Sequence, residues 1–242
     1  MRRRLKIIYT ILLLIIFQSL QGQTYWCCNC AENTKTEPRL PGVLVATPAD
    51  TVTWFNKNWL PGDIFLNSGE IVRNINIKYS GLLDELFWLE PKSGKPVKID
   101  KEAIQKFHFQ SVRGDTSVNF RKIKIKRELS NDSIEVLGQE IYRGNLSLFV
   151  RHTFYVRQRE IINTNSGIIQ RDSYEEDPLY IICFMNKKTV ALKGLTRKNL
   201  YAFAPDKKEQ IKQFFNQSGH LKVETNDEIK VLMQFLGSVI NQ

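Results

Sequence analysis

Residues 59–79, WLPGDIFLNSGEIVRNINIKY, carry the pattern that decides the fold. Apolar residues recur there at the spacing of an extended strand with one buried face, and Arg73 interrupts them. The members of this set are Ile71, Ile75, Ile77 and Tyr79. Asn67-Ser68-Gly69 has the composition of a tight turn, as has Lys92-Ser93-Gly94 further along the chain. The stretch therefore predicts a meander of half-buried antiparallel strands.

The middle of the chain continues this pattern in segments rich in β-branched and aromatic residues. These segments are VNFRKIKIKREL (118–129), SIEVLGQEIYRG (133–144), NLSLFVRHTFYVRQRE (145–160) and YIICFM (180–185). In the first of them, alternation predicts that Ile123 and Ile125 point inward and that lysines 122, 124 and 126 point to solvent. Residues 163–178, NTNSGIIQRDSYEEDP, have the composition of a long polar loop, which is expected to be either functional or mobile.

The last third changes to helical spacing. Pro205 precedes KKEQIKQFFNQ (207–217), and Ser218-Gly219 supplies a stop signal. Thr225 and Glu228 form a Thr-x-x-Glu capping box before an apolar stripe. The stripe consists of Ile229, Leu232, Phe235, Leu236, Val239 and Ile240. We therefore predict an α+β fold: an antiparallel β domain over 53–200, as an open sheet, sandwich or partial barrel, and a C-terminal helical pair over 201–242 packed on it.

The first residues indicate export. MRRRLK is a basic segment, and the eleven apolar residues after it are too few for a comfortable membrane span, which takes roughly 20 residues. QSLQGQ then provides a polar exit, so we expect a signal peptide over 1–23 and a location in the periplasm or at the outer membrane. An uncleaved N-terminal anchor is the alternative. Removal of 1–23 lowers the formal charge from +10 to +6, so much of the basic character belongs to the targeting segment.

Residues 24–52 are predicted to form a flexible tail that carries Cys27, Cys28 and Cys30. Export favours oxidation, so these three residues are candidates for a local disulfide. Metal binding and unpaired thiols are the alternatives, but the cluster has no second cysteine pair and no histidine beside it. Cys183 lies in an apolar run and is expected to behave as a small buried hydrophobe.

Signatures of catalysis are scarce. The three histidines are far apart in sequence, and no nucleophile elbow, phosphate-binding glycine loop or His-Glu-x-x-His motif occurs. The acidic run Glu175-Glu176-Asp177 lacks the spacing of a dedicated calcium loop. We therefore assign no catalytic, cofactor-binding or metal-binding residues from the sequence, and we expect no cofactor.

The chain also resembles uncharacterised exported envelope proteins of the Bacteroidetes. The resemblance is carried by Trp59-x-x-Gly62-x-Ile64-x-Leu66-x-x-Gly69, Lys78-Tyr79, Asp84-Glu85-Leu86, Phe107, Tyr142-Arg143-Gly144 and the segment KKEQIKQFFNQ. These motifs consist of turn glycines, strand apolar residues and helix residues. The resemblance therefore implies a β-rich envelope protein and no particular activity.

Two functions follow as hypotheses, with a hydrolase as a distant third. The first is a non-enzymatic envelope protein, a structural or binding module that docks on another envelope component; nucleic acid is not expected as a partner. The second is a periplasmic carrier of a lipid or other apolar ligand, in which aromatic strand residues face the ligand. The candidates for that ligand face are Trp88, Phe107 and Phe109.

Overall fold

The computed structural model describes residues 40–44, 53–110, 117–126, 132–164, 167–186, 188–219, 223 and 225–240. All of them belong to one compact unit, Leu40–Gln242. The expected signal peptide and the cysteines at 27, 28 and 30 lie outside the described residues. The expected tail over 24–52 is described only at 40–44, and there it forms a strand instead of a flexible segment.

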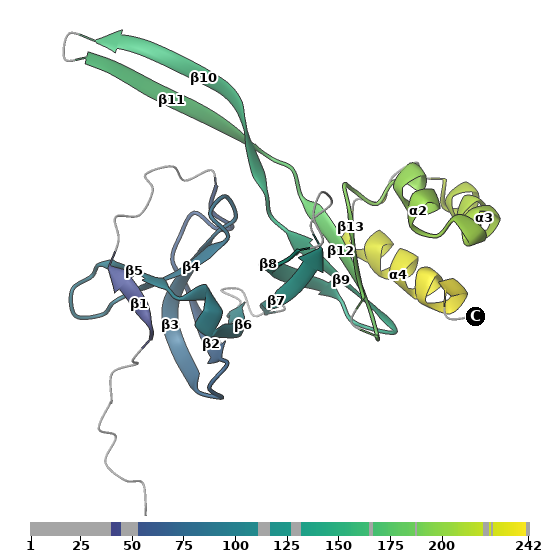
Figure 1. Cartoon of the computed structure of the whole chain (residues 1–242), viewed down its shortest axis with the longest axis horizontal. Helices are drawn as coiled ribbons and strands as arrows, with labels where there is room; N and C mark the ends of the chain where they lie inside the picture. Colours follow the sequence, from purple (N-terminus) through teal and green to yellow (C-terminus); the bar gives the residue numbers. More distant parts are fainter. Residues whose placement is uncertain are drawn as a thin grey trace, which may run out of the picture. The chain divides into compact units, whose positions relative to one another are not determined.

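The elements follow one another as strands and then helices (Figure 1). The strands are β1 (Gly42–Leu44), β2 (Leu60–Leu66), β3 (Ile71–Ser80), β4 (Glu85–Leu89), β5 (Pro96–Ile99), β6 (Ile104–Phe109), β7 (Val118–Lys126), β8 (Ser133–Tyr142), β9 (Leu146–Arg151), β10 (Phe154–Thr164), β11 (Gly167–Glu176), β12 (Leu179–Phe184) and β13 (Thr189–Leu192). The helices are α2 (Arg197–Phe203), α3 (Lys208–Ser218) and α4 (Asn226–Ile240), with short 3₁₀ turns at Lys101–Ala103 and Pro205–Lys207.

Eleven strands form one antiparallel sheet in the order β1-β5-β4-β3-β2-β6-β7-β8-β9-β12-β13, and β10 and β11 pair only with each other. The predicted turns at 67–69 and 92–94 connect β2 to β3 and β4 to β5. Gly69 and Gly94 adopt the positive φ angles, 87° and 63°, that such turns require. The α+β class and the antiparallel meander are thus confirmed, and the outer strands β1 and β13 leave the sheet open.

The sheet curls so that β3 reaches β8, although β2, β6 and β7 lie between them. The link consists of side-chain hydrogen bonds: the Tyr79 hydroxyl lies 3.2 Å from the Leu137 carbonyl oxygen. The first core fills this curl with buried side chains from β2 to β8. Its members include Ile64, Ile77, Tyr79, Leu86, Trp88, Ile104, Phe107, Phe109, Phe120 and Leu137.

A second curl brings β13 beside β7, where the Thr189 hydroxyl donates to the Lys124 carbonyl oxygen at 3.0 Å. Ile123 and Ile125 point into this curl and are buried, as predicted. The other members of this smaller core, called the second core from here on, are Val136, Phe149 and Ile181. Side chains alternate between the two sides of a strand, so residues three positions apart face opposite sides. Phe120 of β7 therefore packs in the first core, and Ile123 packs in the second.

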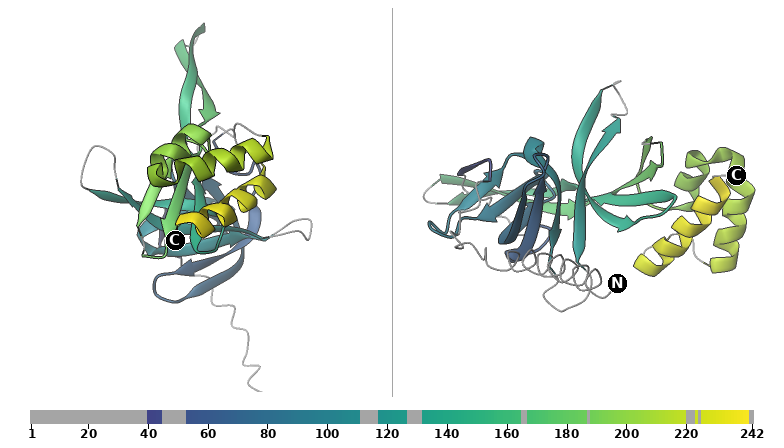
Figure 2. Two further views of the ribbon diagram at one scale, coloured as in Figure 1. Left: turned by 90° about the vertical axis from the view of Figure 1, so that its right-hand side faces the viewer. Right: turned by 90° about the horizontal axis from the view of Figure 1, so that it is seen from below.

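The three α-helices of the described ranges group together beside the sheet (Figure 2). Their buried residues form one core with Leu146, Leu148 and Ile182 of the sheet. The predicted capping box is confirmed, since Glu228 N donates to Thr225 Oγ1 at 3.3 Å and Thr225 N donates to Glu228 Oε2 at 2.9 Å. Gly219, at φ 70°, ends α3 as predicted. None of the helices in the described ranges is long and apolar enough to cross a membrane.

The helical part has one element more than predicted. Helix α2 begins at Arg197, so the predicted boundary between residues 200 and 201 falls inside it. The Thr196 hydroxyl caps α2 by accepting from Asn199 N at 3.3 Å. At seven residues, α2 is too short to show a clear apolar stripe in the sequence.

Three predictions about strands were wrong in detail. Val72 rather than Ile71 is buried, because Asn74 takes a φ of 52° and shifts the alternation along β3. The predicted loop over 163–178 is largely strand β11. Strand alternation in NLSLFVRHTFYV (145–156) predicts that Leu148 and Val150 face the core and that Phe149 faces outward, but Phe149 is buried in the second core.

Candidate functional site

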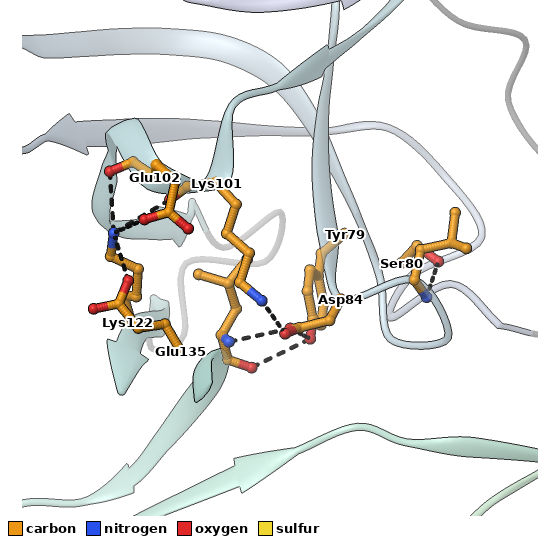
Figure 3. Close-up of polar contacts among 9 residues, drawn as sticks. Tyr79, Ser80, Asp84, Lys101, Glu102, Lys122 and Glu135 are labelled. Atoms are coloured by element: carbon orange, nitrogen blue, oxygen red, sulfur yellow. Dashed lines mark hydrogen bonds and ion pairs between the residues drawn. The ribbon is translucent and has the colours of Figure 1, made fainter. Parts of the chain in front are cut away.

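The most elaborate buried polar site is centred on Asp84, in the turn between β3 and β4 (Figure 3). Its side chain is buried, and its φ of 54° places the carboxylate against β8. Oδ1 accepts from the Tyr79 hydroxyl at 2.9 Å and from Leu137 N at 3.1 Å, while Oδ2 accepts from Lys101 Nζ at 2.5 Å. The carboxylate therefore satisfies donors from three separate parts of the sheet.

A lysine extends this network to the next strands. Lys122 Nζ donates to the carbonyl oxygen of Glu102 at 3.0 Å and lies 3.1 Å from Glu135 Oε2. Lys122 is consequently half-buried between the 3₁₀ turn and β8 rather than on a solvated face, as the sequence pattern had suggested. Neither of the two cavities described below is lined by Asp84, Lys101 or Tyr79. With its oxygens occupied by protein donors, Asp84 acts as a structural clamp.

Burial raises the pKa of Tyr79 well above its usual value near 10, and the neighbouring Asp84 carboxylate raises it further. Because the folded pKa is the higher one, the stability that this group contributes is fully present below about pH 10 and is lost as the pH rises above it. We expect the free energy of unfolding to fall by roughly 1.4 kcal/mol per pH unit above pH 10 from Tyr79 alone. Urea titrations between pH 8 and 11 should show a shallower alkaline slope for Tyr79→Phe. An unchanged slope would contradict this assignment.

The predicted ligand-face residues lie in the first core. Trp88, Phe107 and Phe109 are all buried there, and Phe107 packs edge-on against Phe109 with ring centroids 5.6 Å apart. The indole N–H of Trp88 is buried and has no hydrogen-bond partner among the described residues. None of the three lines either cavity described below. These contacts are those of core packing, and a ligand face at these residues stays a prediction.

The β10–β11 hairpin is held firmly at its base. His152, between β9 and β10, places Nδ1 2.5 Å from Glu176 Oε1 and Nε2 2.8 Å from Gln139 Oε1. Thr153 also hydrogen-bonds with its hydroxyl to the carbonyl oxygen of Asp177. The base of the hairpin also lies close to the turn between β3 and β4. Gly81 of this turn is so near to Phe154, the first residue of β10, that a Cβ added to Gly81 would lie 2.6 Å from the Phe154 ring. The start and end of the hairpin are thereby fixed to the sheet.

The outer part of the hairpin pairs with no strand other than its own partner, and Figure 1 shows the two strands running as a separate ribbon. Ile161 is 66% exposed and Ile168 is 74% exposed. Ile161 pairs with position 170, and Ile168 pairs with position 163. Paired residues share a face, as do residues two positions apart on one strand, so Ile161 and Ile168 lie on the same face of the hairpin. Ile162, which is 36% exposed, lies on the other face. The hairpin therefore carries apolar side chains on both faces near its tip.

A cavity of about 430 Å³ lies beside the second core. It is lined by Arg121, Lys122, Ile123, Lys124, Gly144, Asn145, Ser147, Phe149, Cys183, Phe184, Met185 and Thr189. A second cavity, of about 250 Å³, is lined by Lys106, Asn119, Phe120, Arg121, Glu140 and Arg143. Arg121 is common to both.

Neither Arg121 nor the isoleucine tip of the hairpin, which consists of Ile161, Ile162 and Ile168, was predicted from the sequence. Arg121 belongs to a basic strand whose alternation is typical of a solvated face. Residues 167–176 contain polar and acidic residues that obscured the strand pattern. The signal that was available for the tip is the pair of Ile-Ile sequences at 161–162 and 168–169 on either side of Asn-Thr-Asn-Ser-Gly, a hairpin pattern.

Burial raises the pKa of the Cys183 thiol to about 11. Cys183 is therefore a neutral thiol near neutral pH and a poor nucleophile.

Among the described residues, no three His, Cys, Asp or Glu side chains are grouped closely enough to hold a metal ion. Comparison of the chain with protein-family models, curated proteins and solved structures found no match.

Proposed function

We propose that this chain is an exported, non-enzymatic binding module of the cell envelope, and that it docks on another envelope protein through the β10–β11 hairpin. The observation that carries the proposal is the isoleucine tip, which is exposed on both faces of a hairpin whose base is fixed to the sheet. A hairpin of two strands is at best marginally stable in water by itself, so an exposed apolar tip is unfavourable unless something covers it.

The charges of the hairpin favour a protein groove over a lipid surface. Residues 154–176 carry three arginines against four carboxylates, a formal charge of −1. Such a segment gains no electrostatic attraction to an anionic bilayer. A tip that is apolar on both faces fits between two walls, as in a groove of a partner protein.

Nearer its base, the hairpin has features that discourage pairing with other strands. Arg157 interrupts the register between Val156 and Gln158, and Arg159 forms a salt bridge with Asp172 at 2.9 Å. Bulges and charges on an exposed strand edge oppose non-specific strand addition. Tyr155 and Val156 near the base are also exposed, but the two most exposed apolar side chains among the described residues of the hairpin, Ile161 and Ile168, lie near the tip.

A photo-reactive side chain at Ile168 tests the proposal in the native cell. We expect one discrete cross-linked product with another protein, and its loss when Ile161→Ser is added. Val231 is the matched control, because it is 55% exposed and apolar but lies on α4. Purified Ile161→Ser/Ile168→Ser protein should unfold within about 0.5 kcal/mol of the parent, since these side chains are exposed.

Three results would overturn the docking role. The first is equal cross-linking from positions 168 and 231, or no product from position 168. The second is a product with twice the mass of the chain, which would identify a second copy as the occupant. The third is binding to phospholipid vesicles that is lost in the double serine variant, which would identify a membrane.

A further inference from the structure

The larger cavity combines an apolar wall with a cationic edge. Ile123 and Phe149, which are both buried, belong to its lining, as does Met185, which is 80% exposed. Hydroxyl groups come from Ser147 and Thr189. None of the lining residues is acidic, and the volume of about 430 Å³ is within the usual range for ligand pockets.

Arg121 is the cation that best fits this cavity. It lies on the same face of β7 as Ile123, whereas the ammonium of Lys122 is held on the other side by Glu135 at 3.1 Å. Arg121 Nε is 3.6 Å from Glu140 Oε2, but that oxygen is closer to Arg143 Nη2, at 2.7 Å. The Arg121 side chain is also 45% exposed. Most of its five N–H donors therefore have no partner among the described residues.

We infer that this cavity binds a small anionic amphiphile, with a carboxylate or phosphate head on Arg121 and an apolar chain against Phe149 and Phe184. A guanidinium binds either head through two parallel hydrogen bonds. Its position at the border of an apolar wall selects a molecule with one charged end. The neutral thiol of Cys183 adds no negative charge to the wall. This site is separate from the hairpin tip and from Trp88, Phe107 and Phe109, and it does not depend on the docking role.

Titration calorimetry of the purified protein with octanoate, octyl phosphate and octanol tests the inference. We expect saturable binding of at least one of the two anions and much weaker binding of octanol. The ratio between the two anions distinguishes a carboxylate ligand from a phosphate ligand. Arg121→Gln should weaken the tighter anion about tenfold to a hundredfold, because one charged pair of hydrogen bonds is lost.

Lys126→Gln is the matched control for charge. Lys126 is an exposed cation on the same strand but lines neither cavity, so its removal should change the affinity for the anion by less than about twofold. Met185 gives a second test that does not depend on the buried wall. Met185→Glu should weaken binding of the anion roughly twofold to fivefold, and Met185→Lys should strengthen it, because the residue is exposed and lines the cavity.

Failure to bind either anion would overturn the inference. So would octanol binding as tight as that of the anions, which would mean that the head is not recognised. An affinity for the anion that is unchanged by Arg121→Gln and by both Met185 substitutions would place the ligand elsewhere on the molecule. Thermal unfolding of each variant confirms that the fold is intact, and the exposed Met185 variants keep the test decisive if Arg121→Gln is unstable.

Discussion

Replacing Asp84 with alanine is expected to lower the free energy of unfolding by roughly 3–5 kcal/mol. The change leaves the Leu137 N–H without its acceptor and removes the partner of Lys101. An unsatisfied buried donor alone costs about 1–3 kcal/mol. Alanine at a φ of 54° adds backbone strain of roughly 1 kcal/mol. Urea denaturation monitored by tryptophan fluorescence, with the slope m held to its parental value, measures the loss.

Asp84→Asn separates the hydrogen bonds from the charge. Asparagine tolerates positive φ and keeps an oxygen for Tyr79 and Leu137, but it loses the ion pair with Lys101. Lys101 is partly exposed, so its ammonium can be hydrated, and we expect a loss of only about 1–2 kcal/mol. Equal losses for Asn and Ala would show that the ion pair dominates. A negligible loss for Ala would contradict the clamp altogether.

Local signals predicted those parts of the fold that neighbouring residues determine. The turns at Gly69 and Gly94, the Thr225–Glu228 capping box and the inward side of Ile123 all depend on contacts within a few residues. Each of these has one dominant physical cause, namely positive φ, reciprocal capping or strand alternation. Such causes can be read directly from spacing.

Contacts between distant segments could not be predicted in this way. The clamp joins Asp84 to Leu137, 53 positions apart. An adjacent Asp84-Glu85 pair gives no hint that Asp84 turns inward. The curl that brings β13 beside β7 is also a product of tertiary packing, since it depends on how four strand pairings twist in succession. The cavity beside Arg121 exists only because of that curl.

The tip of the hairpin and its second strand, β11, were missed for a different reason, although the predicted strand over 145–160 includes the first part of β10. The alternation of β10 is broken at Arg157, where the register shifts, and β11 has polar residues on both faces. A strand that is exposed on both sides need not alternate between apolar and polar residues, so the period that identifies half-buried strands is absent. The exposed strand β11 was therefore interpreted as part of a loop over 163–178.

Phe120→Ala is expected to destabilise the fold by roughly 3–5 kcal/mol. Phe120 is fully buried and stacks on Phe107 with ring centroids 4.7 Å apart. Its ring is also 5.0 Å from that of Tyr79, which links the stack to the Asp84 clamp. Truncation removes these contacts and leaves a void that the curled sheet cannot readily close. Urea or thermal denaturation of the purified variant measures the effect.

The same experiment weighs core packing against a ligand face. Phe65→Ala is the matched control, because Phe65 is only half-buried and lies under the Lys106 ammonium at 4.1 Å, so a loss of about 1 kcal/mol is expected. If Phe107, Phe109 and their neighbour Phe120 faced a bound apolar ligand, Phe120→Ala would stay close to parental stability in the ligand-free protein. A large loss there, with Phe65→Ala nearly unaffected, means that the aromatic set holds the sheet in its curl. Ligand binding by this protein would then have to take place outside the first core, as at the cavity beside Arg121.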